Sequence, residues 1–299
     1  MLRRLILAAA DSPRIQRFVG KYGMRLGAAR FVAGETLDEA LVTLRRLNEQ
    51  GLRTNTTLLG EHMKDRAEAE SVVRNYEEVL RRIAAENLRT NVALKLTHLG
   101  VTIDEELGYA NVARLVAEAA RLGNFIRIDM EDSPLVDVTL RIYRRLREAG
   151  HDNVGTVLQS YLYRSEQDLD SLLPLKPNLR IVKGAYNESE TVAYPKKADV
   201  DAAYRRLVER SIAEGGFTAV ATHDEKLIDH ALALDPGPER MELQMLYGVR
   251  TQLQRDLVAR GQRVLCAAPY GPDWFPYLMR RLAERPANLL FFIRNALES

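Results

Sequence analysis

The sequence predicts an α/β protein, a (β/α)₈ barrel with an N-terminal helical addition. Short runs rich in Val, Ile and Leu alternate with longer amphipathic, charge-bearing stretches. Eight such pairs occupy about 235 residues, close to the length typical of this barrel. The runs lack strict polar alternation, which is typical of parallel strands buried on both faces. An open doubly wound sheet stays an alternative, although neither G-x-G-x-x-G nor G-x-x-x-x-G-K occurs.

The first 50 residues lie outside this count, and their pattern predicts two helices, over residues 13–26 and 37–49. We therefore divide the chain into N-terminal helices (1–50) that pack on a barrel (51–299). The predicted strands are 54–59, 91–96, 125–130, 154–160, 179–182, 218–222, 241–246 and 262–267. The helices that follow them are 64–86, 104–122, 134–149, 165–173, 200–214, 225–234, 252–260 and 273–284. Ser165 with Asp168 three residues later has the pattern of a helix start.

Composition excludes several classes of protein. With 46% hydrophobic residues among 299, the chain is not disordered. Its single cysteine, Cys266, excludes a disulfide framework and fits a reducing, cytoplasmic compartment. Forty-three basic residues against 41 acidic ones leave no field to attract nucleic acid. No stretch reaches the roughly 18 apolar residues of a membrane helix. The short apolar run in residues 1–10 predicts a helix packed on the domain, with a peripheral membrane contact as the alternative.

In such a barrel the catalytic residues lie at the carboxyl ends of the strands. The predicted strand ends carry, in order, Glu61, Lys95, Asp129, Gln159, Lys183, Thr222, His223, Asp224, Tyr247 and Tyr270. Only eight of the 43 basic residues are lysines, and two of them, Lys95 and Lys183, stand at strand ends. A buried lysine needs a partner, so each marks either a site or an ion pair that closes the barrel. Asp129 is either a site residue or that structural partner.

The last predicted helix carries Arg280 and Arg281, with Glu284 one turn later. Arg280 and Glu284 could pair along the helix surface. Two adjacent guanidiniums near a rim lysine also suit a clamp for a carboxylate or phosphate. Tyr277 could supply an aromatic wall or belong to the core. The histidines form no H-x-H or H-E-x-x-H, so we expect no metal. These residues predict a barrel enzyme acting on a small anion, with a Schiff-base aldolase still open.

Five segments resemble the proline dehydrogenase family, most closely its short, monofunctional bacterial members. They are Ile126-Arg-Ile-Asp-Met-Glu-Asp132, Leu179-Arg-Ile-Val-Lys-Gly-Ala-Tyr186, Ala221-Thr-His-Asp224, Leu243-Gln-Met-Leu-Tyr-Gly-Val249 and Tyr277-Leu-Met-Arg-Arg-Leu-Ala-Glu284. The resemblance runs in order from about residue 58 to the C-terminus. It implies a distorted (β/α)₈ TIM barrel that holds FAD noncovalently, oxidises L-proline to Δ1-pyrroline-5-carboxylate as the first step of proline catabolism to glutamate, and passes the electrons to a membrane quinone.

The resemblance also implies roles for single residues. Lys95, Arg280 and Arg281 would hold the proline carboxylate, and Asp129 would orient the arginines. Arg180 would lie near the flavin N5. Leu246 and Tyr277 would wall the substrate ring, with Tyr186 nearby. Glu61 and Glu284 match acidic positions that pair with the basic cluster when the site closes. The remaining cofactor contacts would be Met130, Gln159, Lys183, Gly184, Ala185, Thr222 and His223.

One position departs from the family pattern. Two residues before Pro269 the family often has a tyrosine that borders the substrate, whereas this chain has Ala267. A smaller side chain leaves room beside the substrate ring. We therefore keep oxidation of 4-hydroxyproline, or of another substituted proline, as an alternative activity.

Overall fold

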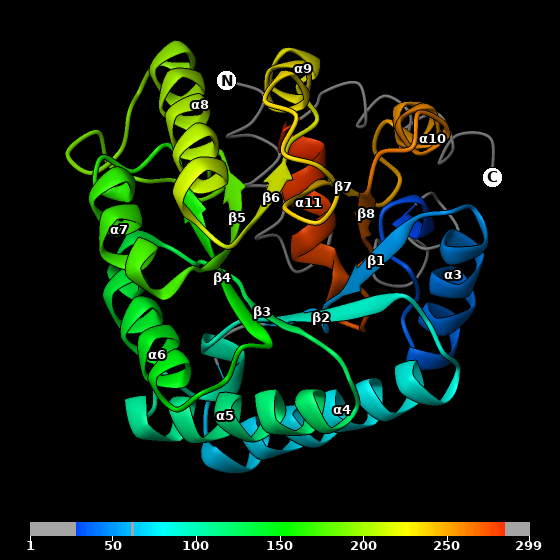
Figure 1. The fold of residues 1–299 in the computed structure, drawn as a ribbon. Helices are drawn as coiled ribbons and strands as arrows, with labels where there is room; N and C mark the ends of the chain where they lie inside the picture. The colour runs from blue at the N-terminus through cyan, green and yellow to red at the C-terminus, as the bar shows by residue number, and fades with distance from the viewer. Residues whose placement is uncertain (1–27, 61–62, 285–299) are drawn as a thin grey trace.

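The structure, a computed structural model, describes residues 28–60 and 63–284; for Ala28 and residues 280–284 the description covers the backbone alone. Eight parallel strands form a closed barrel in which each strand pairs with the next and β8 pairs with β1. Figure 1 looks along this barrel and shows helices around the strands. The strands are β1 (Arg53–Thr56), β2 (Thr90–Leu94), β3 (Ile126–Ile128), β4 (Val154–Gln159), β5 (Asn178–Val182), β6 (Phe217–Ala221), β7 (Met241–Leu246) and β8 (Val264–Ala267).

Amphipathic helices cover the outside of the barrel. They are α3 (Leu37–Glu49), α4 (Arg66–Ala85), α5 (Glu105–Arg121), α6 (Val136–Glu148), α7 (Ser165–Leu172), α8 (Lys197–Glu214), α9 (Glu225–Ala233) and α10 (Thr251–Ala259). Several begin at residues whose side chains accept a hydrogen bond from the first turn. Thr36 forms a capping box with Glu39, and Asp65 and Asp104 cap the next two long helices. Each helix turns an apolar stripe toward the strands, so the main core lies between the two layers.

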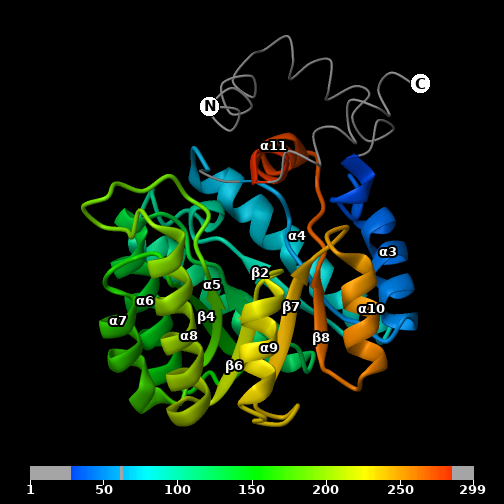
Figure 2. The ribbon, with the colours of Figure 1, turned by 90° about the horizontal axis from the view of Figure 1, so that it is seen from above.

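The last helix that the structure describes, α11 (Trp274–Glu284), does not join this outer layer. It lies over the end of the barrel at which the strands finish, inside the ring in Figure 1 and above the strands in Figure 2. The outer position between α10 and α4 is filled by α3. Ion pairs join α3 to α4, including Arg82 with Asp38. The segment before α3 then reaches the start of α11, where the Trp274 indole donates to Glu35 (2.7 Å).

The barrel and the order of its elements are confirmed, with boundaries displaced by a few residues. β1 ends at Thr56, earlier than the expected residue 59, because only Leu58 continues the pairing, through one bridge to Tyr270. Helix α7 begins at Ser165, so the helix start predicted from Ser165 and Asp168 is confirmed; the Ser165 hydroxyl donates to the Gln159 carbonyl oxygen (2.6 Å) and does not cap the helix. The helix expected over 13–26 lies outside the described residues. The boundary at residue 50 stays a prediction.

Two properties of the described residues bear on the expected classes. Within 28–60 and 63–284, none of the helices combines the length and apolar character needed to traverse a bilayer. Over the same residues, His, Cys, Asp and Glu side chains nowhere come together in a group of three or more suited to a metal ion.

Candidate active site at the carboxyl ends of the strands

Most of the candidate residues lie at one end of the barrel. All but Arg180, which is in the middle of β5, stand on the last residues of a strand or directly after it, and the parallel arrangement brings the strand ends to a common rim under α11 (Figure 2). They are Lys95 after β2, Asp129 and Met130 after β3, Gln159 on β4, Arg180 on β5, Lys183, Gly184 and Ala185 after β5, Thr222 and His223 after β6, and Leu246 on β7.

The Asp129–Arg180 ion pair is the centre of this rim. Nη1 of Arg180 donates to Oδ1 of Asp129 (2.5 Å), and its Nε donates to the amide oxygen of Gln244 (2.6 Å). Arg180 is 9% exposed, yet its Nη2 is buried without a hydrogen-bond partner among the described residues. Buried polar atoms are normally satisfied, so this nitrogen is a donor available to a bound molecule.

A second arginine lies beneath the first. The guanidinium of Arg127 is buried and donates to the carbonyl oxygens of Thr156 (2.9 Å) and Asn178 (2.7 Å). Burial, together with the nearby charge of Arg180, lowers the pKa of Arg127 to about 9. Gly155 makes room for this group, because a Cβ there would lie 2.4 Å from Nη1 of Arg127. Two guanidinium groups therefore lie one below the other in the barrel interior.

The ends of β2 and β3 are joined by a buried carboxylate. The backbone N–H and the hydroxyl of Thr97 donate to the two oxygens of Glu131 (3.1 and 2.6 Å). Lys95, two residues before Thr97, is half-buried. Burial and the charge of Lys95 lower the pKa of His98 to about 4, so the imidazole is neutral near pH 7. Through its two hydrogen bonds with Thr97, Glu131 fixes the spacing between the strand ends that carry Lys95 and Asp129.

Between β5 and β6, Lys183 belongs to a network of four charges. Its ammonium contacts Asp201 on α8 (2.6 Å) and Asp224 after β6 (3.0 Å), and Lys197 contacts the same two carboxylates. Burial opposes the ionisation of both acids, but the hydrogen bonds from the lysines outweigh it and lower the pKa of each. A cavity of about 270 Å³ adjoins this network between α8 and α9.

Gly184 allows the chain to leave β5 closely packed. Its φ of +118° is unfavourable for other residues, and a Cβ would lie 2.2 Å from the ring of Tyr161. After it, Ala185 is exposed and Tyr186 half-buried. The next strand end is joined to β7, because the N–H of Leu246 donates to Nε2 of His223 (2.9 Å). Positions 183–186 and 222–223 thus face one side of the rim.

The remaining candidate residues lie around this rim, on α11 or outside the described residues. Met130 and Thr222 are buried, and the Gln159 side-chain amide donates to the Glu131 carbonyl oxygen (2.8 Å). Tyr277 is half-buried on α11. Arg280, Arg281 and Glu284 lie on the backbone of the same helix, and their side chains are not described. Glu61 falls outside the described residues. The carboxylate clamp and the closing ion pair therefore stay predictions.

Glu131, Glu242 and Gln244 are site residues that the sequence reasoning missed. The last two stand at alternate positions of β7 and are 3% and 4% exposed. Two polar residues two apart in an apolar run indicate one face of a strand. That signal was available in the run 241–246. It could have identified a polar barrel interior.

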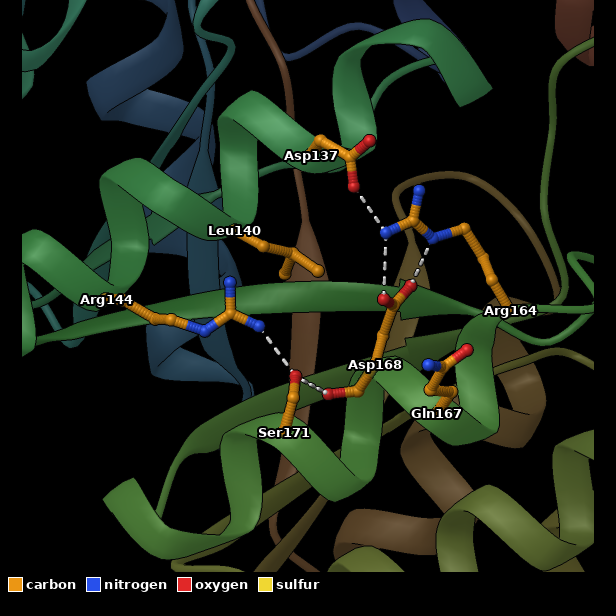
Figure 3. Close-up of a pocket in the computed structure, with 7 residues that line it drawn as sticks. All are labelled: Asp137, Leu140, Arg144, Arg164, Gln167, Asp168 and Ser171. Carbon is orange, nitrogen blue, oxygen red and sulfur yellow. Dashed lines mark hydrogen bonds and ion pairs between the residues drawn. The ribbon is translucent and has the colours of Figure 1, made fainter.

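A larger cavity, of about 470 Å³, lies away from the rim, on the outer layer between α6 and α7. Figure 3 shows Arg164 pairing there with Asp137 and Asp168, and Arg144 donating to Ser171. The charges of these side chains balance one another. We therefore place the candidate active site at the rim, where a buried donor is available.

Comparison with known proteins shows the family to which the chain belongs. A family model described as proline dehydrogenase matches residues 40–294. Proline dehydrogenase 1 of Bacillus subtilis is 39% identical over 100% of both chains. Proline dehydrogenase of Deinococcus radiodurans is 43% identical, over 100% of this chain and 98% of its own.

Solved structures show the same fold. The chain superposes on proline utilization A from Bdellovibrio bacteriovorus, inactivated by N-propargylglycine, with a TM-score of 0.80 and 25% identity. That match covers 87% of this chain and 32% of the larger protein, so the chain corresponds to about a third of its length. The family-model match and the full-length relatives show that this chain belongs to the proline dehydrogenase family, whose members are oxidoreductases of proline catabolism.

Proposed function

We propose that the chain binds FAD at the rim and oxidises L-proline to Δ1-pyrroline-5-carboxylate, the first step of proline catabolism to glutamate. Bound FAD would supply the two-electron acceptor, taking a hydride from C5 of proline at its N5 and passing the electrons to a quinone. The observation that carries this proposal is the buried Nη2 of Arg180 beside Asp129, a donor with no hydrogen-bond partner among the described residues. A flavin ring presents hydrogen-bond acceptors along its edge, so its chemistry fits this donor.

Around that donor the chain offers further contacts for the cofactor. Lys183, Gly184 and Ala185 follow β5, and Thr222 and His223 follow β6, beside the cavity near α8 and α9. Met130 and Gln159 lie on the opposite side of Arg180, on the β3 and β4 ends. The positive charge of Arg180, supported by Arg127 beneath it, would stabilise negative charge that develops on the reduced cofactor.

The substrate would be held by its carboxylate. Lys95 stands at the end of β2, and α11 places the backbone of Arg280 and Arg281 over the same end of the barrel. With the carboxylate fixed, the ring would lie against Leu246 and Tyr277. Orientation of this kind keeps the reacting carbon at near-attack distance, roughly 3–3.5 Å from its acceptor. The substrate amine must be unprotonated as the hydride leaves, and bulk water can take that proton before the substrate binds.

The absorption spectrum tests this proposal directly. A purified protein with flavin bands that are bleached anaerobically by L-proline, and restored by a soluble quinone, is the expected result. A colourless protein that a borohydride reagent traps with its substrate would refute it and favour the Schiff-base aldolase. The ion pairs of Lys183 speak against that alternative for this lysine, because a Schiff-base nucleophile must reach the substrate carbonyl and two carboxylates contact the Lys183 side-chain nitrogen.

A substituted proline is the second candidate substrate. Ala267 ends β8 and is in register with Leu246, the residue expected to wall the substrate ring. Its side chain is small and only half-buried, so space is available beside that wall. This observation favours tolerance for 4-hydroxyproline.

For the cellular setting we propose a cytoplasmic enzyme that contacts the inner face of the membrane peripherally, because its quinone acceptor resides there. The neutral overall balance gives no reason to expect a nucleic-acid partner. Co-sedimentation with vesicles that contain quinone, with and without L-proline, tests the contact. Protein that stays in the supernatant under both conditions would refute it.

A further inference from the structure

Strand β7 directs two polar side chains into the barrel, where aliphatic side chains are the usual filling. Glu242 is 3% exposed and Gln244 is 4% exposed. Burying such groups is unfavourable unless they are hydrogen-bonded, so each needs partners in the interior. Among the described residues, neither Glu242 nor Gln244 forms a hydrogen bond with a helix of the outer layer.

Their partners form one continuous chain through the barrel. Nε of Arg263 donates to Oε2 of Glu242 (2.9 Å), and the Gln244 amide nitrogen donates to Oε1 of the same carboxylate (2.6 Å). The amide oxygen of Gln244 then accepts from Nε of Arg180 (2.6 Å). A carboxylate accepts hydrogen bonds and a guanidinium donates them, so the amide has only one orientation that satisfies both neighbours. Glu242 therefore determines which atom of Gln244 faces Arg180.

This arrangement fixes Arg180 from two sides. Asp129 accepts from Nη1 and Gln244 accepts from Nε, and a planar guanidinium held at two nitrogens cannot rotate about its axis. Nη2 is the nitrogen left without a partner among the described residues. We propose that Gln244 is a positioning residue of the reaction, which acts through Arg180 by directing Nη2 at the cofactor. The inference rests on the proposed binding of a flavin near Arg180.

The experiment compares five variants with the wild-type holoenzyme. Gln244→Met removes both hydrogen bonds at similar length, and Gln244→Glu keeps an acceptor for Arg180 while sharing a proton with Glu242 across the same contact. Arg180→Met is combined with Gln244→Met as a double-mutant cycle. The matched control is Asn153→Ala, which removes amide hydrogen bonds to Val116 and Asn124 at the opposite end of the barrel. If Gln244→Met does not fold, Gln244→Asn, which withdraws the amide by one methylene, replaces it.

Two quantities are measured, the midpoint potential of the bound flavin without substrate and the rate constant of flavin reduction by L-proline. We expect Gln244→Met to lower the rate constant by about tenfold or more, the size of a lost hydrogen bond to a charged group. The potential should move in the same direction as in Arg180→Met. Gln244→Glu should stay near the wild type, and the double variant should be no worse than Arg180→Met to within about twofold.

The inference is overturned if Gln244→Met lowers only the melting temperature, as Asn153→Ala is expected to do, or if the effects of Gln244→Met and Arg180→Met multiply. A wild-type protein that contains no flavin is a different result. It would overturn the proposed cofactor, and the role of Gln244 with it. A coloured wild type with unaffected Gln244 variants would overturn the positioning role alone.

Discussion

The buried imidazole of His98 makes the stability of the fold depend on pH. His98 is 3% exposed, and its Nδ1 has no hydrogen-bond partner among the described residues. Its surroundings are the Lys95 ammonium, the ring of Tyr76 packed edge-on at 6.4 Å between centroids, and the backbone of Gly60, where a Cβ would lie 2.5 Å from Nε2. Nothing here favours a second proton on the ring, so the folded protein keeps it neutral.

The magnitude follows from the two pKa values. Burial and Lys95 lower the pKa of His98 to about 4 in the folded protein, against 6.5 for an unperturbed histidine. As pH falls from about 6.5 toward 4, the unfolded chain binds a proton that the folded protein does not. Stability contributed by the neutral ring is present above pH 6.5 and is lost over this window. The full difference is worth about 3.4 kcal/mol, of which about 2 kcal/mol is lost between pH 7 and pH 5.

Urea denaturation at pH 7 and pH 5 measures this effect. The free energy of unfolding of the wild type should fall by about 2 kcal/mol more between these conditions than that of His98→Leu, which cannot titrate. Tyr76→Phe is the matched control, because it alters the side chain that packs against His98. Burial holds the pKa of Tyr76 well above 10, so Tyr76 itself does not titrate between pH 5 and pH 7. If the wild type and His98→Leu lose equal stability on acidification, His98 is not neutral and desolvated in the folded protein.

Three further predictions concern the rim. Gly184→Ala should lower the ratio of bound flavin to protein, and it should lower the free energy of unfolding by about 1–3 kcal/mol. The control is Gly237→Ala, which also has a positive φ but has nothing within 4 Å of its Cβ, and it should keep its flavin. Equal flavin content in the two variants would contradict the role of the close contact at Gly184. Arg280→Met and Arg281→Met should each raise KM for L-proline sharply and slow flavin reduction, and near-normal KM values in both would exclude the clamp. Ala267→Tyr should lower kcat/KM for 4-hydroxyproline relative to L-proline, and an unchanged ratio would end the case for a substituted substrate.

Local pattern was sufficient for the barrel because each strand and helix is encoded within its own segment. The run 241–246 coincides with β7, and the stretch 37–49 coincides with α3. The sequence could locate the candidate site only by identifying the residues at the strand ends. This placed Asp129 at the rim, whereas its contact with Arg180, 51 residues later, follows from the closure of the barrel.

Pairings across the chain could not be predicted in the same way. Lys183 was expected to contact the cofactor, and nothing in its spacing indicated that Asp201 and Asp224 would both lie beside it. The polar residues of β7 were overlooked because a run of strand-forming residues does not reveal which face is filled by aliphatic side chains. Only the closed barrel shows that Gln244 meets Arg180.

The place of α3 in the outer layer has a consequence for how this barrel can be altered. The helices around the barrel are shifted by one position relative to the strands. The helix before the first strand, α3, completes the outer layer, and α11, which follows β8, covers the end of the barrel instead (Figure 1). Removing residues up to Arg53 would therefore open the wall as well as free the start of α11 from Glu35. We therefore expect that α3 and α11 cannot be removed independently, because α3 completes the outer layer and α11 covers the end of the barrel.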